Sequence, residues 1–268
     1  RSDTTAGGTA TIRISGTGNQ TLDGNGTIDG GKLPNINIDK ANGILFLVGN
    51  VTLGRFASWK YTQGVIDAAT NNSNVVFTRN NTITGSHTLH NVEFFPIGSV
   101  DFTISSGTEL TVGGTLKFSG LSFGSSRIFG GIINALGDIE ITTIAGLGRF
   151  GGGATIKITG SANQTLNSIA PPGAGKIPNV IINKSGGTLT LSDTISIDGN
   201  WNYIQGDVDA ISLNSAIVFT SAFITPSYDI DGEGAADTMT FNDVIFNSVS
   251  GALDITGAFD INGNLIIE

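Results

Sequence analysis

Apolar residues in this chain alternate with polar ones in short segments, and the clearest example is the stretch Asn179–Gly206. Its apolar residues fall in pairs two positions apart, as expected where side chains of a strand alternate between two faces. Between the pairs lie Gly, Ser, Asn and Asp, the residues that turns favour. The stretch therefore predicts four short strands and leaves no room for a helix. The pairs are Val180/Ile182, Leu189/Leu191, Ile195/Ile197 and Trp201/Tyr203.

The same pattern occurs in three further stretches, Asn35–Gly64, Asn91–Gly120 and Asp243–Glu268. A pattern met four times indicates a repeat architecture, in which each unit buries its apolar edge only by stacking on a neighbour. The pairs are Ile36/Ile38, Leu45/Leu47, Val51/Leu53 and Trp59/Tyr61; Val92/Phe94, Phe102/Ile104, Leu110/Val112 and Leu116/Phe118; and Val244/Phe246, Leu253/Ile255, Phe259/Ile261 and Leu265/Ile267.

A longer repeat contains the shorter one. GGTATIRISGTGNQTL (Gly7–Leu22) matches GGGATIKITGSANQTL (Gly151–Leu166), and WKYTQGVIDA (Trp59–Ala68) matches WNYIQGDVDA (Trp201–Ala210). The offset between the two tryptophans is 201 − 59 = 142 residues. We therefore divide the chain into two tandem copies, residues 1–143 and 144–268, which form one continuous stack.

Short strands, short turns and internal repetition are compatible with two all-β folds. One is a parallel β-solenoid, or β-helix, with about 20–30 residues per coil. The other is a string of tandem antiparallel β-sandwiches. Successive copies keep the same inward residues, as stacked coils should, so we predict the solenoid. Further strands are expected at Thr11–Ile14, Asn74–Arg79, Asn81–Thr84, Arg127–Ile133 and Asp138–Thr142.

Composition narrows the range of possible functions. Of 268 residues, 39% are hydrophobic and only 13% are charged, about half the usual charged share. The net charge of −9 argues against binding to nucleic acid and to anionic membrane surfaces. The apolar runs are too short to insert in a membrane. The absence of Cys excludes disulfides. Low charge with abundant Thr and Asn favours an extracellular location.

The segments GGGATIKITGSANQTL and IPNVIINKSGGTLTLSDTISIDGNWNY (Ile177–Tyr203) resemble the tandem repeats of very large secreted surface proteins of bacteria, notably the Bacteroidota. The resemblance extends over nearly the whole chain, and it lies in the general pattern of residues more than in one motif. It implies a secreted adhesin or filament repeat with a β-helix-like fold, and it implies no catalytic residues.

Two loops carry oxygen ligands at alternate positions with glycines between them, which is how a loop wraps a calcium ion. We name them as candidate calcium loops, with ordinary solvated turns as the competing interpretation. Calcium is the one possible cofactor that the sequence indicates. The candidate ligands are Asp23, Asn25 and Asp29 in DGNGTID, and Asp229, Asp231 and Glu233 in DIDGEGAAD.

The sequence gives little support for a metal, catalytic or sugar-binding site built from its histidines, paired carboxylates or tryptophans. His87 and His90, the only histidines, are three apart and so face opposite sides of a strand, which predicts surface polar residues. Asp207 and Asp209 share a face, but the partners they need for catalysis are not evident. Trp59 and Trp201 occupy equivalent positions in the inward register, so we expect both in the core. We therefore predict that the chain is not an enzyme.

The sequence end GNLIIE followed by the start RSDTTAGGTATIRI resembles the joint between the copies. We therefore expect neither terminus to be a cap: the chain is an interior excerpt of a longer array, or a subunit that stacks end to end as a homopolymer. The predicted function is a rigid extracellular filament or adhesin stalk. The alternative is a carbohydrate-binding or polysaccharide-cleaving β-helix, with surface glycans as partners. The expected packing residues are Ile36, Leu53, Trp59, Tyr61, Val180, Ile197, Trp201 and Tyr203.

Overall fold

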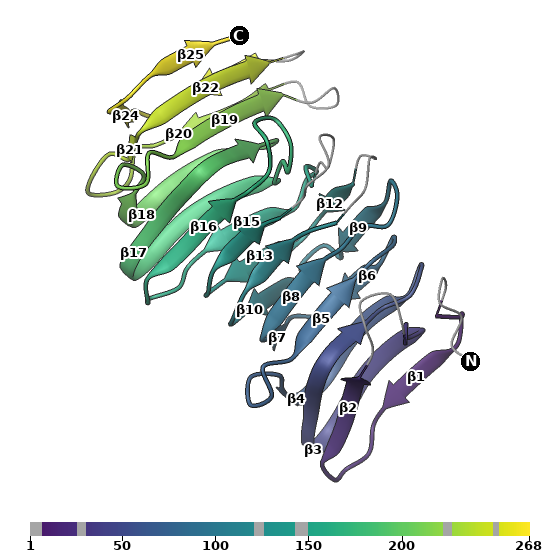
Figure 1. Ribbon diagram of the computed structural model, residues 1–268. Coiled ribbons are helices and arrows are strands. Elements are labelled where there is room, and N and C mark those ends of the chain that lie inside the picture. Colours follow the sequence, from purple (N-terminus) through teal and green to yellow (C-terminus); the bar gives the residue numbers. More distant parts are fainter. Residues whose placement is uncertain (1–6, 26–30, 121–125, 143–149, 222–226, 249–251) are drawn as a thin grey trace.

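The chain forms an elongated stack of parallel β-strands with its termini at opposite ends (Figure 1). The computed structural model describes residues 7–25, 31–120, 126–142, 150–221, 227–248 and 252–268. Within these ranges there is no helix, and every pairing between two named strands is parallel. The predicted β-solenoid is confirmed, and the alternative of antiparallel sandwiches is wrong.

Three strands make one coil of the solenoid. After β9, β10 and β11, the next strand β12 lies on β9, then β13 lies on β10 and β14 on β11. The length of a coil is the sequence distance between two residues that pair in a ladder. In the shortest coil Val75 pairs with Val92, which is 92 − 75 = 17 positions later. In the longest coil Trp201 pairs with Ile230, which is 230 − 201 = 29 positions later. The expected coil length of about 20–30 residues therefore holds for all but the shortest coil.

The strands fall on three sides. Four of them bend around corners and contribute to more than one side: β3 (Asn35–Thr52), β4 (Ser58–Asp67), β17 (Asn179–Ile197) and β18 (Trp201–Asp209). The first side also contains β1 (Thr11–Ile14), β6 (Thr82–Thr84), β9 (Asp101–Ile104), β12 (Arg127–Phe129), β19 (Ala216–Ser221), β22 (Asp243–Ser248) and β25 (Leu265–Ile267). The second contains β2 (Gln20–Asn25), β7 (His87–Leu89), β10 (Glu109–Val112), β13 (Ile132–Ala135), β15 (Thr155–Ile158), β20 (Ser227–Asp231) and β23 (Ala252–Ile255). The third contains β5 (Asn74–Phe77), β8 (Asn91–Phe94), β11 (Leu116–Phe118), β14 (Ile139–Ile141), β16 (Gln164–Ser168), and a separate two-stranded sheet of β21 (Thr240–Phe241) and β24 (Asp260–Ile261).

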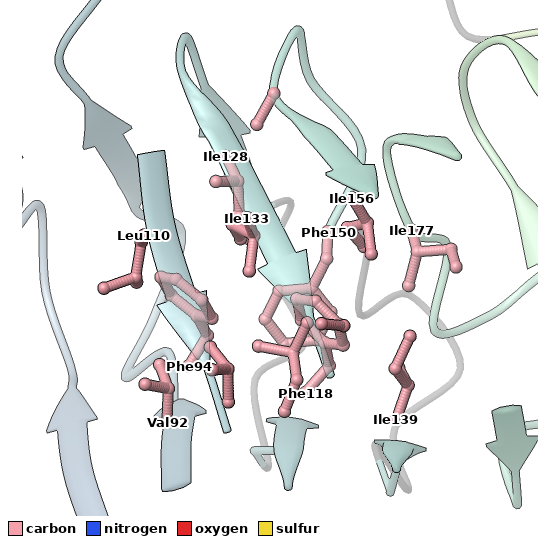
Figure 2. Packing of buried hydrophobic residues seen from close by; sticks show 14 of the residues in the cluster. Val92, Phe94, Leu110, Phe118, Ile128, Ile133, Ile139, Phe150, Ile156 and Ile177 are labelled. Atoms are coloured by element: carbon pink, nitrogen blue, oxygen red, sulfur yellow. The ribbon is translucent and has the colours of Figure 1, made fainter. Parts of the chain in front are cut away.

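The core is a column of apolar side chains enclosed by the three sides. Figure 2 shows its middle, where Val92, Phe94 and Phe118 point inward from neighbouring coils. The rings of Phe94 and Phe118 stack with centroids 5.8 Å apart, and Phe77 stacks on Phe94 at 5.5 Å. Offset stacking of this kind adds about 0.5–1.5 kcal/mol per pair beyond burial alone. The core is therefore continuous along the stack, coil upon coil.

The alternating pairs read from the sequence are confirmed as inward positions in the first three stretches, where nearly all are fully buried and Tyr61 is half-buried. Trp59 and Trp201 are both fully buried, as expected. The last stretch differs, because only Val244 of its eight residues is buried. No later coil lies on β23 or β25 among the described residues, so these inward positions stay uncovered.

Two details of the strand prediction are wrong. Neither Asn179–Gly206 nor Asn35–Gly64 forms four short strands, because β17 runs without interruption from Asn179 to Ile197 and β3 from Asn35 to Thr52. Arg127–Ile133 is not one strand: Gly130 and Gly131, both at positive φ, make a corner between β12 and β13. Thr11–Ile14 is confirmed as predicted, and the other expected strands are confirmed with shorter bounds.

The two sequence copies are rotated relative to each other by one side of the solenoid. Trp59 lies in the ladder β4–β6–β9–β12 of the first side, between Ile36 and Ile83. Its equivalent Trp201 lies in the ladder β7–β10–β13–β15–β17–β18 of the second side, beside Val180. One copy therefore spans a whole number of coils plus one side.

Candidate functional site

The two copies share a buried lysine at a corner of the coil. Lys40 is 1% exposed, and its Nζ donates to the carbonyls of Gly16 at 2.6 Å and Gly18 at 2.8 Å and to Oε1 of Gln20 at 2.8 Å. An ammonium has three protons, so all of them have acceptors. We call this arrangement the corner clamp. The sequence did not indicate it, because lysines are almost always exposed.

The clamp recurs in the second copy with the same geometry. Lys184 is 2% exposed, and its Nζ donates to the carbonyls of Gly160 at 2.7 Å and Ala162 at 2.9 Å and to Oε1 of Gln164 at 2.5 Å. Desolvation by burial lowers the pKa of Lys184. The three acceptors around Nζ match the three protons of an ammonium and so favour the charged form against this desolvation.

Gln164 extends the second clamp over three coils. Its Nε2 donates to the carbonyls of Ala135 at 3.2 Å and Gly137 at 2.7 Å in the preceding coil, while its Oε1 accepts from Lys184 in the following coil. Gln164 is 2% exposed. A fully satisfied buried polar network of this kind fixes one geometry, because any shift of register leaves a polar group unpaired. The clamp therefore fixes how successive coils are aligned.

His87 is a core residue, which corrects the expectation of a surface side chain. It is 8% exposed, and its Nε2 accepts a hydrogen bond from the indole Nε1–H of Trp59 at 2.8 Å. Its Nδ1 therefore carries the proton and donates to the carbonyl of Gly85 at 2.7 Å. The imidazole also stacks on Tyr61 with centroids 5.1 Å apart. Desolvation by burial lowers the pKa of His87, which favours the neutral ring.

A shallow groove lies at the equivalent corner of each copy. In the first copy it has a volume of about 310 Å³ and is lined by Tyr61, Val65 and His87, among others. In the second copy it measures about 200 Å³, and Tyr203 and Asp237 line it. The hydroxyl of Tyr203 donates to the Asp237 carboxylate at 2.7 Å, and burial followed by this bond raises the pKa of Tyr203. The grooves share a position but differ in chemistry.

The first candidate calcium loop is only partly described. Asp23 is exposed on β2, where it faces Val48 of β3 in the ladder. Asn25 ends β2, and nothing further is described of its side chain. Asp29 lies outside the described residues. The calcium hypothesis for this loop therefore stays a prediction.

The second candidate loop begins on β20 and is better described. Asp229 is exposed, and Asp231 accepts a hydrogen bond from the backbone N–H of Glu233 at 3.0 Å. Glu233 itself forms an antiparallel bridge with Thr238. Over the described ranges, no three His, Cys, Asp or Glu side chains are grouped so that they could hold a metal ion. Calcium binding here stays a prediction.

Asp229 and Asp231 contribute to an open groove of about 240 Å³ on the outside of the second side. Polar residues from successive coils line it. Asn200 accepts a hydrogen bond from the backbone N–H of Asp229 at 3.0 Å, and Asn179 accepts one from the N–H of Asn200 at 2.8 Å. This groove carries two carboxylates and several amides, which can accept and donate hydrogen bonds. The lining also includes Thr155, Val180, Ile181, Trp201, Asn202 and Thr256.

Asp209 has a structural role that the sequence left open. Its carboxylate accepts hydrogen bonds from the backbone N–H groups of Ile211 at 3.1 Å and Ser212 at 2.9 Å. The Ser212 hydroxyl and backbone N–H, followed by the N–H of Ile211, lower the pKa of Asp209. Asp67 holds the equivalent turn of the first copy through Thr70. Of the two carboxylates that share a face, Asp209 therefore holds a turn of the chain.

Among the described residues, none of the secondary structure is a helix long and apolar enough to cross a membrane. The features shared by both copies, which are the corner clamp, the buried tryptophan and the corner turns, all serve packing between coils. Comparison of the chain with protein-family models, with curated proteins and with solved structures finds no match.

Proposed function

We propose that this chain is a rigid structural rod, the shaft of an extracellular filament or of an adhesin stalk. The observation that carries the proposal is the continuous parallel stacking, with one apolar core from the first described coil to the last but one. Every coil is hydrogen-bonded to the next through the backbone on its sides, so bending requires many bonds to stretch together. Such a rod can transmit force and keep the parts attached to its two ends at a fixed distance.

The side-chain contacts that occur in both copies support the same function. Lys40 and Lys184 align coils at one corner, and the hydroxyls of Tyr61 and Tyr203 lie 2.7 Å from the backbone carbonyl oxygens of Gly64 and Gly206. The lateral grooves, by contrast, differ between the copies. Repetition of the packing residues with variation of the surface is what a spacer requires.

The rod proposal is tested by the shape and rigidity of the molecule in solution. We expect small-angle scattering of the 268-residue chain to give the cross-section of a thin cylinder, with a pair-distance distribution skewed to long distances. Native material should appear as straight rods in electron microscopy. A symmetric, compact distance distribution, or rods that bend freely between the two copies, would contradict the proposal.

Glycan binding is a second candidate function, and the groove with Asp229 and Asp231 is the observation that favours it. Two carboxylates and adjacent amides can accept and donate hydrogen bonds to sugar hydroxyls. Titration of the chain with neutral oligosaccharides, followed by NMR of the amides of Asn200 and Asn202, tests it. Shifts that vanish in the Asp229→Asn variant would support binding at this groove, and unchanged spectra would exclude it for those sugars.

A further inference from the structure

One corner of the first copy brings together three positively charged residues from successive coils. The backbone N–H of Gly54 donates to the carbonyl of Leu33 at 2.8 Å, so the first two coils meet here. The N–H of Phe56 donates to the carbonyl of Arg79 at 2.9 Å, which adds the third coil. The three residues are Lys32, Arg55 and Arg79, and we call them the basic corner.

In the described part of the chain, none of these three cationic groups forms a hydrogen bond or an ion pair. Lys32 is nevertheless only 5% exposed. Nε of Arg79 is buried and has no hydrogen-bond partner. Burying a charged group without a counter-ion is costly, so the basic corner favours the binding of an anion.

A carboxylate next to the basic corner is already neutralised. The backbone N–H of Asp101 donates to Oδ1 of Asn80 at 2.7 Å, which places Asp101 beside the turn that contains Arg79. Both carboxylate oxygens of Asp101 accept hydrogen bonds from Arg127, at 2.9 and 2.8 Å. The charge of the basic corner is therefore not balanced by this neighbour, although the whole chain has a net charge of −9.

The second copy carries a carboxylate of its own at the equivalent corner. The backbone N–H of Asp198 donates to the carbonyl of Ile177 at 2.8 Å, which is the bond that Gly54 forms in the first copy. Asp198 is 4% exposed. Lys176, the counterpart of Lys32, is 6% exposed and does have an interaction partner. The first copy therefore keeps the buried lysine but has a glycine in place of the aspartate.

The two arginines occur only in the first copy. Arg79 corresponds to Ser221 where VVFTR matches IVFTS. The loop Gly54–Ser58, which contains Arg55, is two residues longer than its counterpart Asp198–Asn200. At these positions the first copy has three cations and no carboxylate, whereas the second copy has one lysine and one carboxylate. The missing group is thus a carboxylate from outside the chain.

Phe56 adds an exposed aromatic ring to the basic corner. It is 62% exposed, and its φ is 60°. A bulky residue in this left-handed region is strained, and such strain is concentrated at ligand sites. The guanidinium of Arg55 lies 4.6 Å from the centre of the ring. An aromatic ring beside cations matches a sugar acid, which has an apolar C–H face and a carboxylate.

We propose that the basic corner binds an acidic saccharide, a hexuronic acid unit of an anionic polysaccharide. The carboxylate of the sugar supplies the charge that Asp198 supplies in the second copy, and the pyranose ring packs on Phe56. Arginine suits this ligand because its guanidinium binds a carboxylate through two parallel hydrogen bonds. The site does not depend on the rod function, and it is separate from the groove of Asp229 and Asp231.

Titration of the chain with trigalacturonate at low ionic strength tests the proposal, with NMR of the amides of Phe56 and Arg79 as the readout. We expect both amides to shift. The methyl ester of the same trisaccharide has no charge and should bind about tenfold more weakly, because it loses charge-assisted hydrogen bonds. Added salt should weaken the binding of trigalacturonate, because it screens exposed charges.

Three variants locate the binding. Arg79→Ser, with the residue of the second copy, should weaken trigalacturonate binding about tenfold. Lys157→Ser on β15 also removes one positive charge, from the second side, and is the matched control that should bind like the wild type. Phe56→Gly removes the ring and relieves the strain of the positive φ, so it should weaken binding without lowering the stability of the fold.

Several results would overturn the proposal. These are unshifted amides at millimolar trigalacturonate, equal binding of the methyl ester, and full binding by Arg79→Ser. A triglutamate peptide that binds as tightly as trigalacturonate, with no effect of Phe56→Gly, would indicate a site for acidic peptides and overturn the saccharide assignment. If Arg79→Ser does not fold by circular dichroism, Arg55→Ser, at an exposed residue, provides the same test. None of these results bears on the rod function, which scattering tests separately.

Discussion

At the scale of single residues, the buried lysines show how a charged group can serve a packed interior. Lys184 lies at a corner where the backbone leaves two carbonyls, Gly160 and Ala162, facing inward. Buried carbonyls without a donor cost about 1–3 kcal/mol each. The ammonium satisfies both and also Gln164. The main role of this lysine is therefore to donate hydrogen bonds to the backbone.

The clamp predicts a specific loss of stability. We expect Lys184→Met, which keeps the length of the side chain, to lower the free energy of unfolding by about 3 kcal/mol, because two carbonyls lose their donor. Denaturant unfolding followed by circular dichroism measures it. Lys60→Met, at an exposed lysine, is the control and should stay within about 0.5 kcal/mol of wild type. Equal effects of the two substitutions would show that the clamp contributes nothing.

His87 predicts a pH dependence of stability. Burial lowers its pKa in the folded chain below the value of about 6.5 expected when unfolded. Below that value the unfolded state binds a proton that the folded state resists, so stability falls as pH decreases. One such group changes the free energy of unfolding by at most about 1.4 kcal/mol per pH unit. Protonation would also place a hydrogen on Nε2, against the N–H of Trp59.

Comparing variants separates the contribution of His87 to the pH dependence of stability from the contribution of the carboxylates. Unfolding of the wild type, His87→Gln and His90→Gln should be measured between pH 8 and pH 5, a range chosen about the ordinary histidine pKa. We expect His87→Gln to have a shallower slope below pH 6.5, and His90→Gln to follow the wild type. A His87→Gln slope equal to that of wild type would mean that the imidazole titrates normally in the fold.

At the scale of strands, the sequence predicted which residues face inward but not where strands end. Alternation of apolar and polar residues depends only on the two faces of a strand, so pairs such as Val180 and Ile182 could be read directly. Gly186 and Gly187 predicted a turn, yet β17 continues through them. Gly187 has φ +63°, and a Cβ there would lie 2.3 Å from the carbonyl carbon of Ala162. The glycine permits a sharp bend within a paired strand.

The residues that link coils were missed for a related reason. Lys184, Gln164 and His87 are polar, and each is buried only because a partner arrives from another coil. Their partners are 20 or 28 residues away in sequence. A reading of local alternation contains no information on such pairs. The one available signal was the matched spacing of the NQTL and NK or DK segments, because Gln20 and Lys40 are also 20 residues apart.

At the scale of the whole molecule, a stack of coils has interior units with two neighbours and end units with one. In such quasi-one-dimensional proteins, stability is close to a sum of unit and nearest-neighbour contributions. Ladders such as β10–β13–β15 lie in the middle, while β1 and β25 each have one partner in the described chain. Opening should therefore begin at the ends, where fewer bonds must break.

Hydrogen exchange tests this gradient. We expect amides of β10 and β13, which have a paired strand on both sides, to exchange slowest, and amides of β25 to exchange fastest among the strands. Uniform protection along the stack would mean that the chain opens as a single unit and not coil by coil.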